Sequence, residues 1–350
     1  MFGKKVKKVI SLLMAAVLAA GLLSGCARGQ KQADNGAAGT EQTAAITVTD
    51  QAGREVTLEK PAENIVSSYY ISTALLIALG CEDKLTGIER KADTRELYKL
   101  AAPQLLSLPA VGSGKGINIE ETAALAPDVV ILPARLKDNV TALEELNIPV
   151  VIVNPETQED FEACVTLLAQ ITGTDKRGEE LLTYYHQKMD EAKTLTEGLD
   201  KPVVYMAAGA DYLRTCTPGM YQHDLISMAG GQNAAAELTQ GYWQDVSPEQ
   251  VLAFNPDYIF AVNYAEYSLA DIREDEALSE ITAVKEGRIF TFPSRIEAWD
   301  YPTPSSVLGV LWLTCQLHPE VYSREQYIRE AKEFYQTYFD ITVTEEQLGL

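Results

Sequence analysis

The residues of this 350-residue sequence that are best suited to chemistry are arginines, tyrosines and tryptophans that follow short apolar segments. Arginines offer forked donors for anionic oxygen, and aromatic rings offer flat apolar surface. Open α/β sheets bind ligands at the carboxyl ends of their strands, which is where we expect these residues to lie. We therefore expect a cleft for an oxygen-rich, partly aromatic, anionic ligand. The candidate binding residues are Tyr69, Tyr70, Arg90, Arg135, Tyr212, Arg214, Tyr242, Trp243, Arg295, Trp299 and Tyr301.

Two further residues, Lys91 and Tyr264, occupy similar positions. Taken singly, a loop arginine or tyrosine is more often exposed or a packing residue than a ligand contact. Trp243 and Trp299 are the strongest individual candidates, because a tryptophan in a loop usually has a partner.

The sequence contains no constellation for a common class of enzyme, since neither G-x-S-x-G nor H-E-x-x-H occurs. The three histidines do not pair at metal-ligand spacing, so we expect no metal site and no cofactor. The glycines of VGSGKGIN fail the phosphate-loop pattern, because Lys115 is followed by Gly116 rather than Ser or Thr. Five loop acids leave an exported enzyme or chelatase as a remote alternative: Glu89, Asp211, Asp245, Glu297 and Asp300.

Residues 1–25 have the pattern of an export signal, with four lysines before an apolar run that is too short for a comfortable membrane span. The run ends at LLSGC, where small residues before Cys26 resemble a lipobox, so we expect lipidation of Cys26. Residues 26–45 are small and polar and are expected to form a flexible tether.

Charge and cysteine usage narrow the class of protein further. Removing residues 1–25 takes away four lysines and no acid, which changes the formal charge from −21 to −25. Such an excess speaks against nucleic acid as a partner. Four widely spaced cysteines, expected as buried thiols with one disulfide left open, are Cys81, Cys164, Cys216 and Cys315.

The elements that must position the candidate residues alternate between strands and helices. Apolar residues in 174–199 recur at helical spacing, with Gly198 as a stop signal, and this helix would be about 35 Å long. The main expected strands are 64–68, 84–88, 129–132, 150–153, 203–207, 258–262 and 288–292, after a hairpin at 46–58. Other expected helices are 72–79, 141–146, 161–172, 220–229, 305–317 and 323–339.

An internal repeat supports a two-lobed plan. In GINIEETAALAPDVVILP, Glu120 precedes Pro127 by seven residues, and in DVSPEQVLAFNPDYIFAV, Glu249 precedes Pro256 by the same number. Both copies predict a loop, an acid in a first helical turn, a short helix and a buried strand. We expect an α/β fold with two doubly wound lobes of parallel sheets, 46–173 and 200–350, joined by the single spine helix 174–199.

These segments resemble one family. DQAGREVTLEKPAENIVSSYYISTALLIALGCEDKLTGIER, INIEETAALAPDVVIL, the spine and VSPEQVLAFNPDYIF are similar to the periplasmic binding proteins for iron(III)-siderophores, haem and vitamin B12. The resemblance covers about residues 45–320. It implies a binding protein of an ABC importer, with a shallow cleft between lobes that close little.

The resemblance also implies partners and a location. In this family one glutamate on each lobe docks onto the permease dimer, which is driven by an ATPase, and the matching positions are Glu120 and Glu249. We expect a monomer that is anchored to the outer face of the cell membrane by the lipid on Cys26. Ala27, in place of an aspartate retention signal, favours a cell with a single membrane.

The cargo is less determined than the fold. A ferric siderophore-type chelate is favoured, haem or a corrinoid comes next, and a molybdate-type oxyanion also stays open. Tyr69, Tyr70 or Tyr301 could ligate haem iron, whereas the arginines favour an anionic cargo over cobalamin. A binding protein that captures manganese or zinc ions directly for an importer would need three or four His, Asp or Glu ligands at strand ends, and the histidine positions argue against it.

Overall fold

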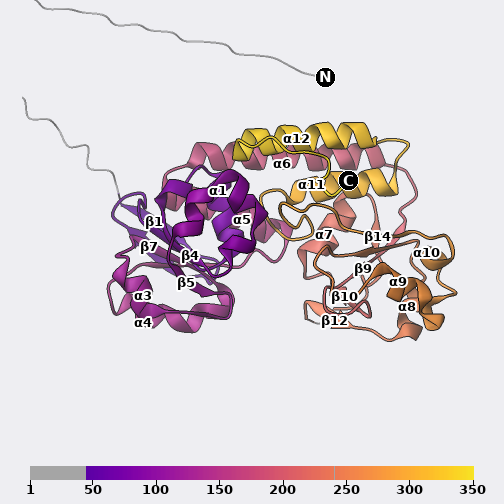
Figure 1. The fold of residues 1–350 in the computed structure, drawn as a ribbon, viewed down its shortest axis with the longest axis horizontal. Helices are drawn as coiled ribbons and strands as arrows, with labels where there is room; N and C mark the ends of the chain where they lie inside the picture. Colours follow the sequence, from indigo (N-terminus) through magenta and orange to yellow (C-terminus); the bar gives the residue numbers. More distant parts are fainter. Residues whose placement is uncertain (1–44, 240) are drawn as a thin grey trace, which may run out of the picture. The chain divides into compact units, whose positions relative to one another are not determined.

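Short runs of branched apolar residues build a six-stranded sheet in the first lobe of the computed structural model, which describes residues 45–239 and 241–350 (Figure 1). The sheet order is β6-β5-β4-β3-β7-β8, and only β6 runs antiparallel to its neighbour. All residues of β7 and β8 are buried, as expected where helices cover both faces of a parallel sheet. The strands are β3 (Ile65–Ser67), β4 (Leu85–Glu89), β5 (Ala110–Ser113), β6 (Gly116–Ile117), β7 (Val129–Pro133) and β8 (Val150–Val153).

The helices of the first lobe connect these strands in order. They are α1 (Tyr70–Ala78), α2 (Glu96–Ala101), α3 (Ile119–Ala124), α4 (Val140–Glu144) and α5 (Gln158–Thr172), with 3-10 turns at Glu82–Lys84, Ala92–Thr94, Pro103–Ser107 and Ala134–Asn139. The expected hairpin is present as β1 (Ile46–Thr49) and β2 (Glu55–Leu58), and its turn places Gly53 at a φ of 76°.

The second lobe has a mixed sheet of the order β12-β10-β9-β13-β14, with β11 also paired to β9. Its parallel part, β9, β11, β13 and β14, includes all three strands that the sequence predicts here. The antiparallel strands β10 and β12 were not predicted, since each is only three residues long and carries polar residues. The strands are β9 (Val203–Ala207), β10 (Arg214–Cys216), β11 (Gln232–Asn233), β12 (Trp243–Asp245), β13 (Tyr258–Ala261) and β14 (Ile289–Thr291). The helices are α7 (Tyr221–Met228), α8 (Pro248–Phe254), α9 (Leu269–Glu274), α10 (Thr282–Lys285), α11 (Ser306–Leu317) and α12 (Arg324–Phe339), with a 3-10 turn at Glu276–Leu278.

The two copies of the sequence repeat are held in the same way. In each copy the aspartate of the Pro-Asp pair accepts a hydrogen bond from a backbone N–H at the start of the neighbouring strand. Asp128 accepts from the backbone N–H of Asn64 at 2.9 Å, and Asp257 accepts from that of Val203 at 2.8 Å. Glu120 and Glu249 occupy the second position of α3 and α8, and both are exposed. The repeat therefore reflects one structural unit that is used in both lobes.

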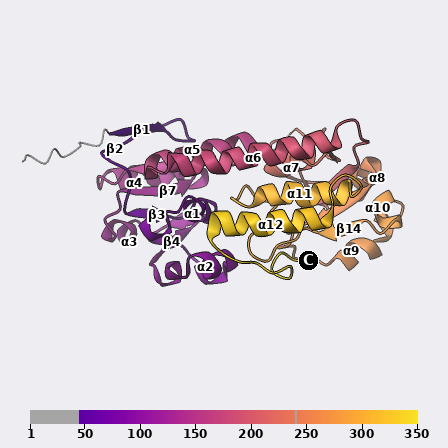
Figure 2. The same ribbon diagram turned by 90° about the horizontal axis from the view of Figure 1, so that it is seen from above.

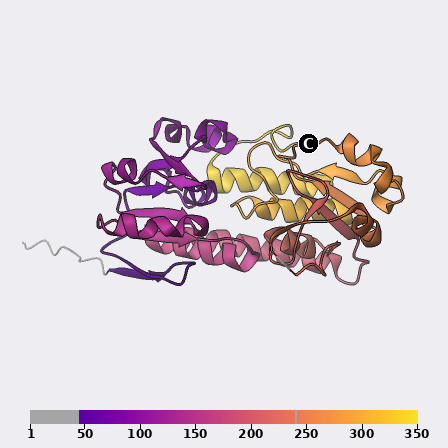
Figure 3. The ribbon, with the colours of Figure 1, turned by 90° about the horizontal axis from the view of Figure 1, so that it is seen from below.

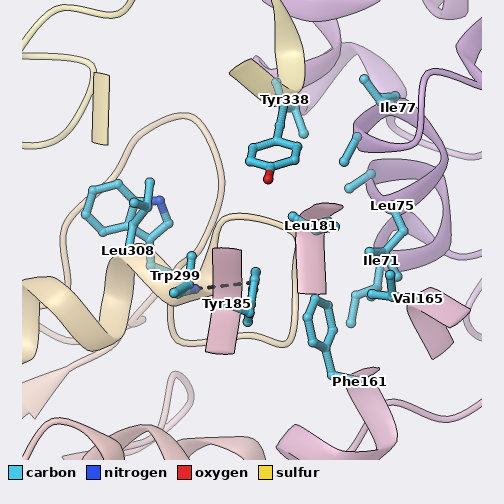
Figure 4. Packing of buried hydrophobic residues seen from close by; sticks show 14 of the residues in the cluster. Ile71, Leu75, Ile77, Phe161, Val165, Leu181, Tyr185, Trp299, Leu308 and Tyr338 are labelled. Atoms are coloured by element: carbon cyan, nitrogen blue, oxygen red, sulfur yellow. Dashed lines mark hydrogen bonds between the residues drawn. The ribbon is translucent and has the colours of Figure 1, made fainter. Parts of the chain in front are cut away.

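The spine helix is α6 (Asp175–Thr196), which ends two residues before Gly198 and carries buried Leu181 and Tyr185 on one face. Figure 4 shows these side chains among buried residues of α1, α5 and α11. The Tyr185 hydroxyl lies 2.9 Å from the carbonyl oxygen of Thr303, just before α11. Together with the two sheets, α6 gives the expected α/β fold of two lobes joined by a long helix.

A second helix, α12, strengthens this connection. The sequence predicted the helix but not its packing along the spine. Helix α12 lies alongside α11 and along the spine (Figure 2, Figure 3). Arg177 of α6 donates to the carbonyl oxygen of Ala78 in α1 at 3.1 Å and to that of Thr337 in α12 at 2.7 Å. Lys188 of α6 forms an ion pair with the buried Glu330 of α12 at 2.8 Å. The hinge between the lobes is therefore a bundle and not an isolated helix.

Several expectations fall on residues that lie outside the described ranges. The export signal 1–25, the lipidation site Cys26 and nearly all of the tether 26–45 belong to them. Among the described residues, no helix combines the length and the apolar character that crossing a membrane requires. The four described cysteines are buried free thiols.

Candidate functional site

Four tyrosines from both lobes form a continuous line of ring contacts, which we call the tyrosine row. Tyr69 and Tyr70, where β3 leads into α1, meet edge to face with ring centroids 5.6 Å apart. Tyr70 meets Tyr301 of the second lobe at 6.0 Å, and Tyr301 stacks on Tyr264 at 5.0 Å with 11° between the ring planes. The row thus connects the carboxyl end of β3 to that of β13, where α/β sheets place their ligands.

Arginines face the first-lobe half of the row. Cζ of Arg135 lies 4.9 Å from the centroid of the Tyr69 ring, and its Nε donates to the carbonyl oxygen of Gly114. Cζ of Arg95 lies 4.2 Å from the centroid of the Tyr70 ring, within cation–π range. Nε of Arg95 is buried, and its guanidinium makes no hydrogen bond or ion pair with any residue in the described parts of the chain. Arg95 therefore has unused donors beside an aromatic wall.

Buried carboxylates face the second-lobe half. The Tyr264 hydroxyl donates to Oδ2 of Asp300 at 2.9 Å, while Oδ1 of this fully buried residue has no partner among the described residues. Glu297, on the same loop, accepts a hydrogen bond from the Ser305 hydroxyl. Burial raises the pKa of Glu297 to about 7 and that of Asp300 to about 6. Burial also raises the pKa of Tyr301 to about 12, so this phenol stays protonated at neutral pH.

A cavity of about 310 Å³ opens against the tyrosine row and receives side chains from both lobes. The first lobe supplies Tyr70, Arg95 and Tyr98, among others. The second lobe contributes Asn263, Tyr264, Arg295, Glu297 and Tyr301. A backbone hydrogen bond of 3.2 Å from Leu97 to Ile296 crosses between the lobes beside it. A second hollow of about 440 Å³ shares Asn263, Ser294 and Arg295 with it and extends toward Gly349. Cations, acids and phenols thus meet in one space, which suits binding of a polar, anionic molecule.

The structure brings together only some of the residues that the sequence singled out. Tyr70, Arg295 and Tyr301 line the cavity, and Tyr69 and Arg135 join it through the tyrosine row. The guanidinium of Arg295 is paired with Glu346 at 3.1 Å. The other candidates are not among the lining residues: Arg90, Tyr212, Arg214, Tyr242, Trp243 and Trp299.

Each of these outlying residues has a different environment. Arg90 lies at a shallow surface hollow with Ser113 and Lys115. The Tyr212 hydroxyl donates to Asp275 at 3.1 Å, and Arg214 pairs with Asp245 at 3.3 Å. Tyr242 is half exposed and Trp243 is half-buried in β12.

Trp299 is placed in the core and not at the cavity surface. Its side chain is fully buried, its Nε1 donates to the Tyr335 hydroxyl of α12 at 3.0 Å, and its ring meets Tyr327 edge to face at 5.9 Å. The physical reason is that a large apolar ring gains most from complete burial. Its partner is thus the C-terminal helix.

Several cavity residues were missed as binding residues or were named in another role, Asn263 among them. Arg95 lies six residues beyond the end of β4, in a stretch without periodicity. Tyr98 follows in α2, and its hydroxyl donates to Glu89 at 2.7 Å. Glu297 was named only as a possible catalytic acid. No group of three or more His, Cys, Asp or Glu side chains in the described ranges is arranged to hold a metal ion.

Comparison with known proteins places the chain in a family. A family model described as "Periplasmic binding protein" matches residues 65–296. The molybdate-binding protein MolA of Haemophilus influenzae is 26% identical over 83% of this chain and 90% of its own length. The ABC transporter substrate-binding lipoprotein YvrC of Bacillus subtilis is 24% identical over 90% of this chain and 99% of its own length. A solved periplasmic solute binding protein from Veillonella parvula is 27% identical, covers 87% of this chain and 97% of its own, and superposes with a TM-score of 0.74.

The matched residues include β3, the spine, both copies of the repeat and most of the cavity lining. The chain therefore belongs to the periplasmic binding protein family.

Proposed function

We propose that this protein is the extracytoplasmic binding lipoprotein of an ABC importer, and that its cargo is an anionic ferric chelate of the siderophore type. The observation that carries the proposal is the unpaired guanidinium of Arg95 in a cavity walled by the tyrosine row. A similar protein, YvrC, is named as an ABC transporter substrate-binding lipoprotein. The lobes 46–173 and 200–350 would hold the cargo between them, on either side of the spine region 174–199.

The chemistry of the cavity favours a chelate with aromatic or flat parts. Phenol rings bind flat surfaces through dispersion, while the guanidinium of Arg95 binds anionic oxygens with charge-assisted hydrogen bonds. We propose that Tyr69, Tyr70, Arg95, Arg135 and Tyr301 contact the cargo.

A molybdate-type oxyanion is the second candidate. It is favoured by the relation to MolA, which is named as a molybdate-binding protein, and by the same Arg95 donors. Haem and a corrinoid remain further alternatives on the same fold. An exported enzyme is disfavoured, since the proteins similar to this chain are named as binding proteins.

The cargo is tested by calorimetric titration of the purified full-length protein in detergent. The panel contains ferric catecholate and hydroxamate chelates, haem, cobalamin and molybdate. We expect saturable binding of an anionic ferric chelate with a dissociation constant below about 1 μM. Tight binding of another member alone would reject the ferric chelate and identify the cargo class.

We further propose that Glu120 and Glu249 dock onto the two halves of a permease dimer. The two exposed acids have the same position in the repeat, so together they can address a partner with two-fold symmetry. Replacing both with alanine should leave cargo affinity within about 2-fold and should strongly lower uptake by cells. Alanine at the exposed Glu145 and Glu274 is the control for lost charge. Normal uptake in the Glu120→Ala, Glu249→Ala double variant would contradict the docking role.

The lipid anchor on Cys26 is a separate part of the proposal. A Cys26→Ala variant should appear in the aqueous phase after detergent partition, whereas Ser24→Ala should stay in the detergent phase. Equal partition of the two variants would contradict the anchor.

A further inference from the structure

The second-lobe end of the cavity is built to accept hydrogen bonds. A phenol has one proton to donate, and Tyr264 donates it to Oδ2 of Asp300 at 2.9 Å. Although 37% of Tyr264 is exposed, the loss of water around its phenol group and the charge of Asp300 raise the pKa of Tyr264 above its usual value, so the phenol keeps this proton. The Tyr264 oxygen therefore presents only its lone pairs to the cavity that it lines.

The carboxylate of Asp300 can accept more hydrogen bonds than the described residues donate to it. Its side chain is completely buried, and Oδ1 makes no hydrogen bond within the described ranges 45–239 and 241–350, although the buried side chain of Gln222 lies near enough to lower the pKa of Asp300. No lysine, arginine or histidine of these ranges forms an ion pair with it. Asp300 does not line the cavity, so it acts on a bound molecule through Tyr264 and through its buried negative charge, which favours a bound donor or cation and opposes a bound anion.

The comparable carboxylate of the first lobe is already satisfied. Glu89 accepts hydrogen bonds from Tyr98 at 2.7 Å and from Thr73 at 2.8 Å, one on each oxygen. Asp300 thus differs from Glu89 in having an oxygen without a partner beside the tyrosine row.

At the other end of the cavity, Arg95 can only donate. The two ends therefore make opposite demands on one bound molecule. We propose that Asp300, acting through Tyr264, is a specificity-determining acceptor, which selects a cargo with an O–H or N–H donor beside its anionic oxygens and disfavours fully deprotonated oxyanions. The inference rests on the proposed role in binding an anionic cargo, and it deepens that role by naming a feature of the cargo.

The physical basis is the cost of mismatched polar groups. A site that is built to bond a donor rejects an analogue without it by large factors, because its buried acceptors are left unpaired. Here a donor-free dianion would also face the buried charge of Asp300.

The test uses two tetrahedral dianions at pH 8, hydrogen phosphate with one O–H and molybdate with none. Calorimetric titration should show that the wild-type protein prefers hydrogen phosphate by at least about 10-fold. Asp300→Asn should bind molybdate at least about 10-fold more tightly than wild type and should lose the preference. The new amide can donate to Tyr264, so the phenol can turn its own proton toward the cavity.

Two variants separate this mechanism from simpler ones. Glu266→Gln removes one negative charge from the exposed loop that carries Tyr264, and it should leave the preference within about 3-fold. Tyr264→Phe removes the acceptor, and it should weaken hydrogen phosphate binding without improving molybdate binding as much as Asp300→Asn does. The thermal unfolding midpoint of each variant checks that the fold is retained.

Several outcomes would overturn the inference. They are equal or tighter binding of molybdate by the wild-type protein, an unchanged preference in Asp300→Asn, and failure of Asp300→Asn to bind either anion. The cargo panel tests the proposed function separately. If the wild-type protein binds no ferric chelate but prefers hydrogen phosphate, the proposed cargo is wrong and the acceptor site is supported. If it binds a ferric chelate but does not prefer hydrogen phosphate, the proposed cargo is supported and the acceptor site is wrong.

Discussion

The two walls of the cavity use the same aromatic residue with opposite electrostatic support. In the first lobe, Tyr69 and Tyr70 lie under the guanidinium groups of Arg135 and Arg95. In the second lobe, Tyr264 is hydrogen-bonded to a buried carboxylate and stacks on Tyr301. The two lobes therefore share a scaffold, but the groups that they place at the cavity differ in charge.

An asymmetric molecule bound in this cavity would be oriented by this difference. Donors concentrate on one wall and acceptors on the other, so a molecule that binds in one direction would be mismatched in the reverse direction. Arg295 also lines the cavity from the second lobe, but its guanidinium is paired with Glu346, whereas that of Arg95 has no ion-pair partner among the described residues.

The largest expected effect comes from removing the cation of the first wall. Arg95→Ala should weaken binding of a ferric chelate by about 100-fold, which corresponds to about 3 kcal/mol, because the cargo loses charge-assisted hydrogen bonds in a buried place. The thermal unfolding midpoint should fall only slightly, because Arg95 makes no hydrogen bond with a described residue and its removal costs the protein only the cation–π contact with Tyr70. Calorimetry and thermal unfolding measure the two quantities.

Arg90→Ala is the matched control, because Arg90 follows the same strand but lies outside the cavity. A loss of affinity in Arg90→Ala as large as that in Arg95→Ala would show that general charge, and not the contact, attracts the cargo. Unchanged affinity in Arg95→Ala would show that Arg95 does not bind the cargo.

The contrast between Arg95 and Trp299 shows what the sequence could and could not predict. Helices, buried strands and the repeat follow from periodicity, caps and the Pro-Asp breaks, so the fold was accessible. Of the residues that the strand-end rule selected, Tyr70 and Tyr301 line the cavity and Tyr69 contacts Tyr70, while their role in binding stays a prediction. The rule could not find Arg95, because its position depends on how an aperiodic loop folds back over α1.

The sequence also does not show which way a side chain in a loop points. Trp299 and Tyr301 are two residues apart in the same loop, yet one is buried against α12 and the other lines the cavity. A strand would place both on one face, but this loop has no fixed period. Tertiary packing decides which ring lines the cavity.

Glu297 and Asp300, the buried acids on the second-lobe side of the cavity, should make the stability of the folded protein depend on pH. Burial raises the pKa of Glu297 from 4.5 to about 7 and that of Asp300 from 3.8 to about 6. The folded protein therefore binds these protons more tightly than the unfolded chain, so this stabilisation is full below about pH 4 and is lost as the pH rises through 6 and 7. Several polar or titratable groups surround each carboxyl. Those near Glu297 are Arg95, Thr303, Ser305, Tyr185 and Tyr335. Those near Asp300 are Tyr70, Tyr264, Tyr301, Gln222 and Cys216.

The free energy of unfolding should fall between pH 5 and pH 8 by about 2 kcal/mol for each carboxyl. Chemical denaturation at several pH values measures this slope, and the Glu297→Gln, Asp300→Asn double variant should reduce it. Glu274→Gln, which changes an exposed acid, should leave the slope as it is. If the double variant keeps the wild-type slope, the pH dependence arises elsewhere.

The smallest expected effects come from two glycines that let each wall form. A Cβ on Gly114 would lie 1.8 Å from Nη2 of Arg135, and a Cβ on Gly209 would lie 2.8 Å from the ring of Tyr264. Arg135 can move aside because the clash is at the end of a flexible side chain, so Gly114→Ala should weaken chelate binding by only about 3-fold. Tyr264 is held by a stacked ring and a hydrogen bond, so Gly209→Ala should displace it from Asp300 and weaken binding by about 10-fold.

Each variant has a control in its own lobe, because a Cβ on Gly116 meets nothing within 4 Å and one on Gly219 meets its nearest atom at 3.8 Å. Alanine at these two positions should leave the affinity unchanged by calorimetry. A loss in Gly114→Ala that exceeds the loss in Gly209→Ala would reverse the comparison, because it would make the arginine the rigidly placed group and the tyrosine the adaptable one. The order of the two effects thus tests whether the acceptor wall is the more preorganised of the two.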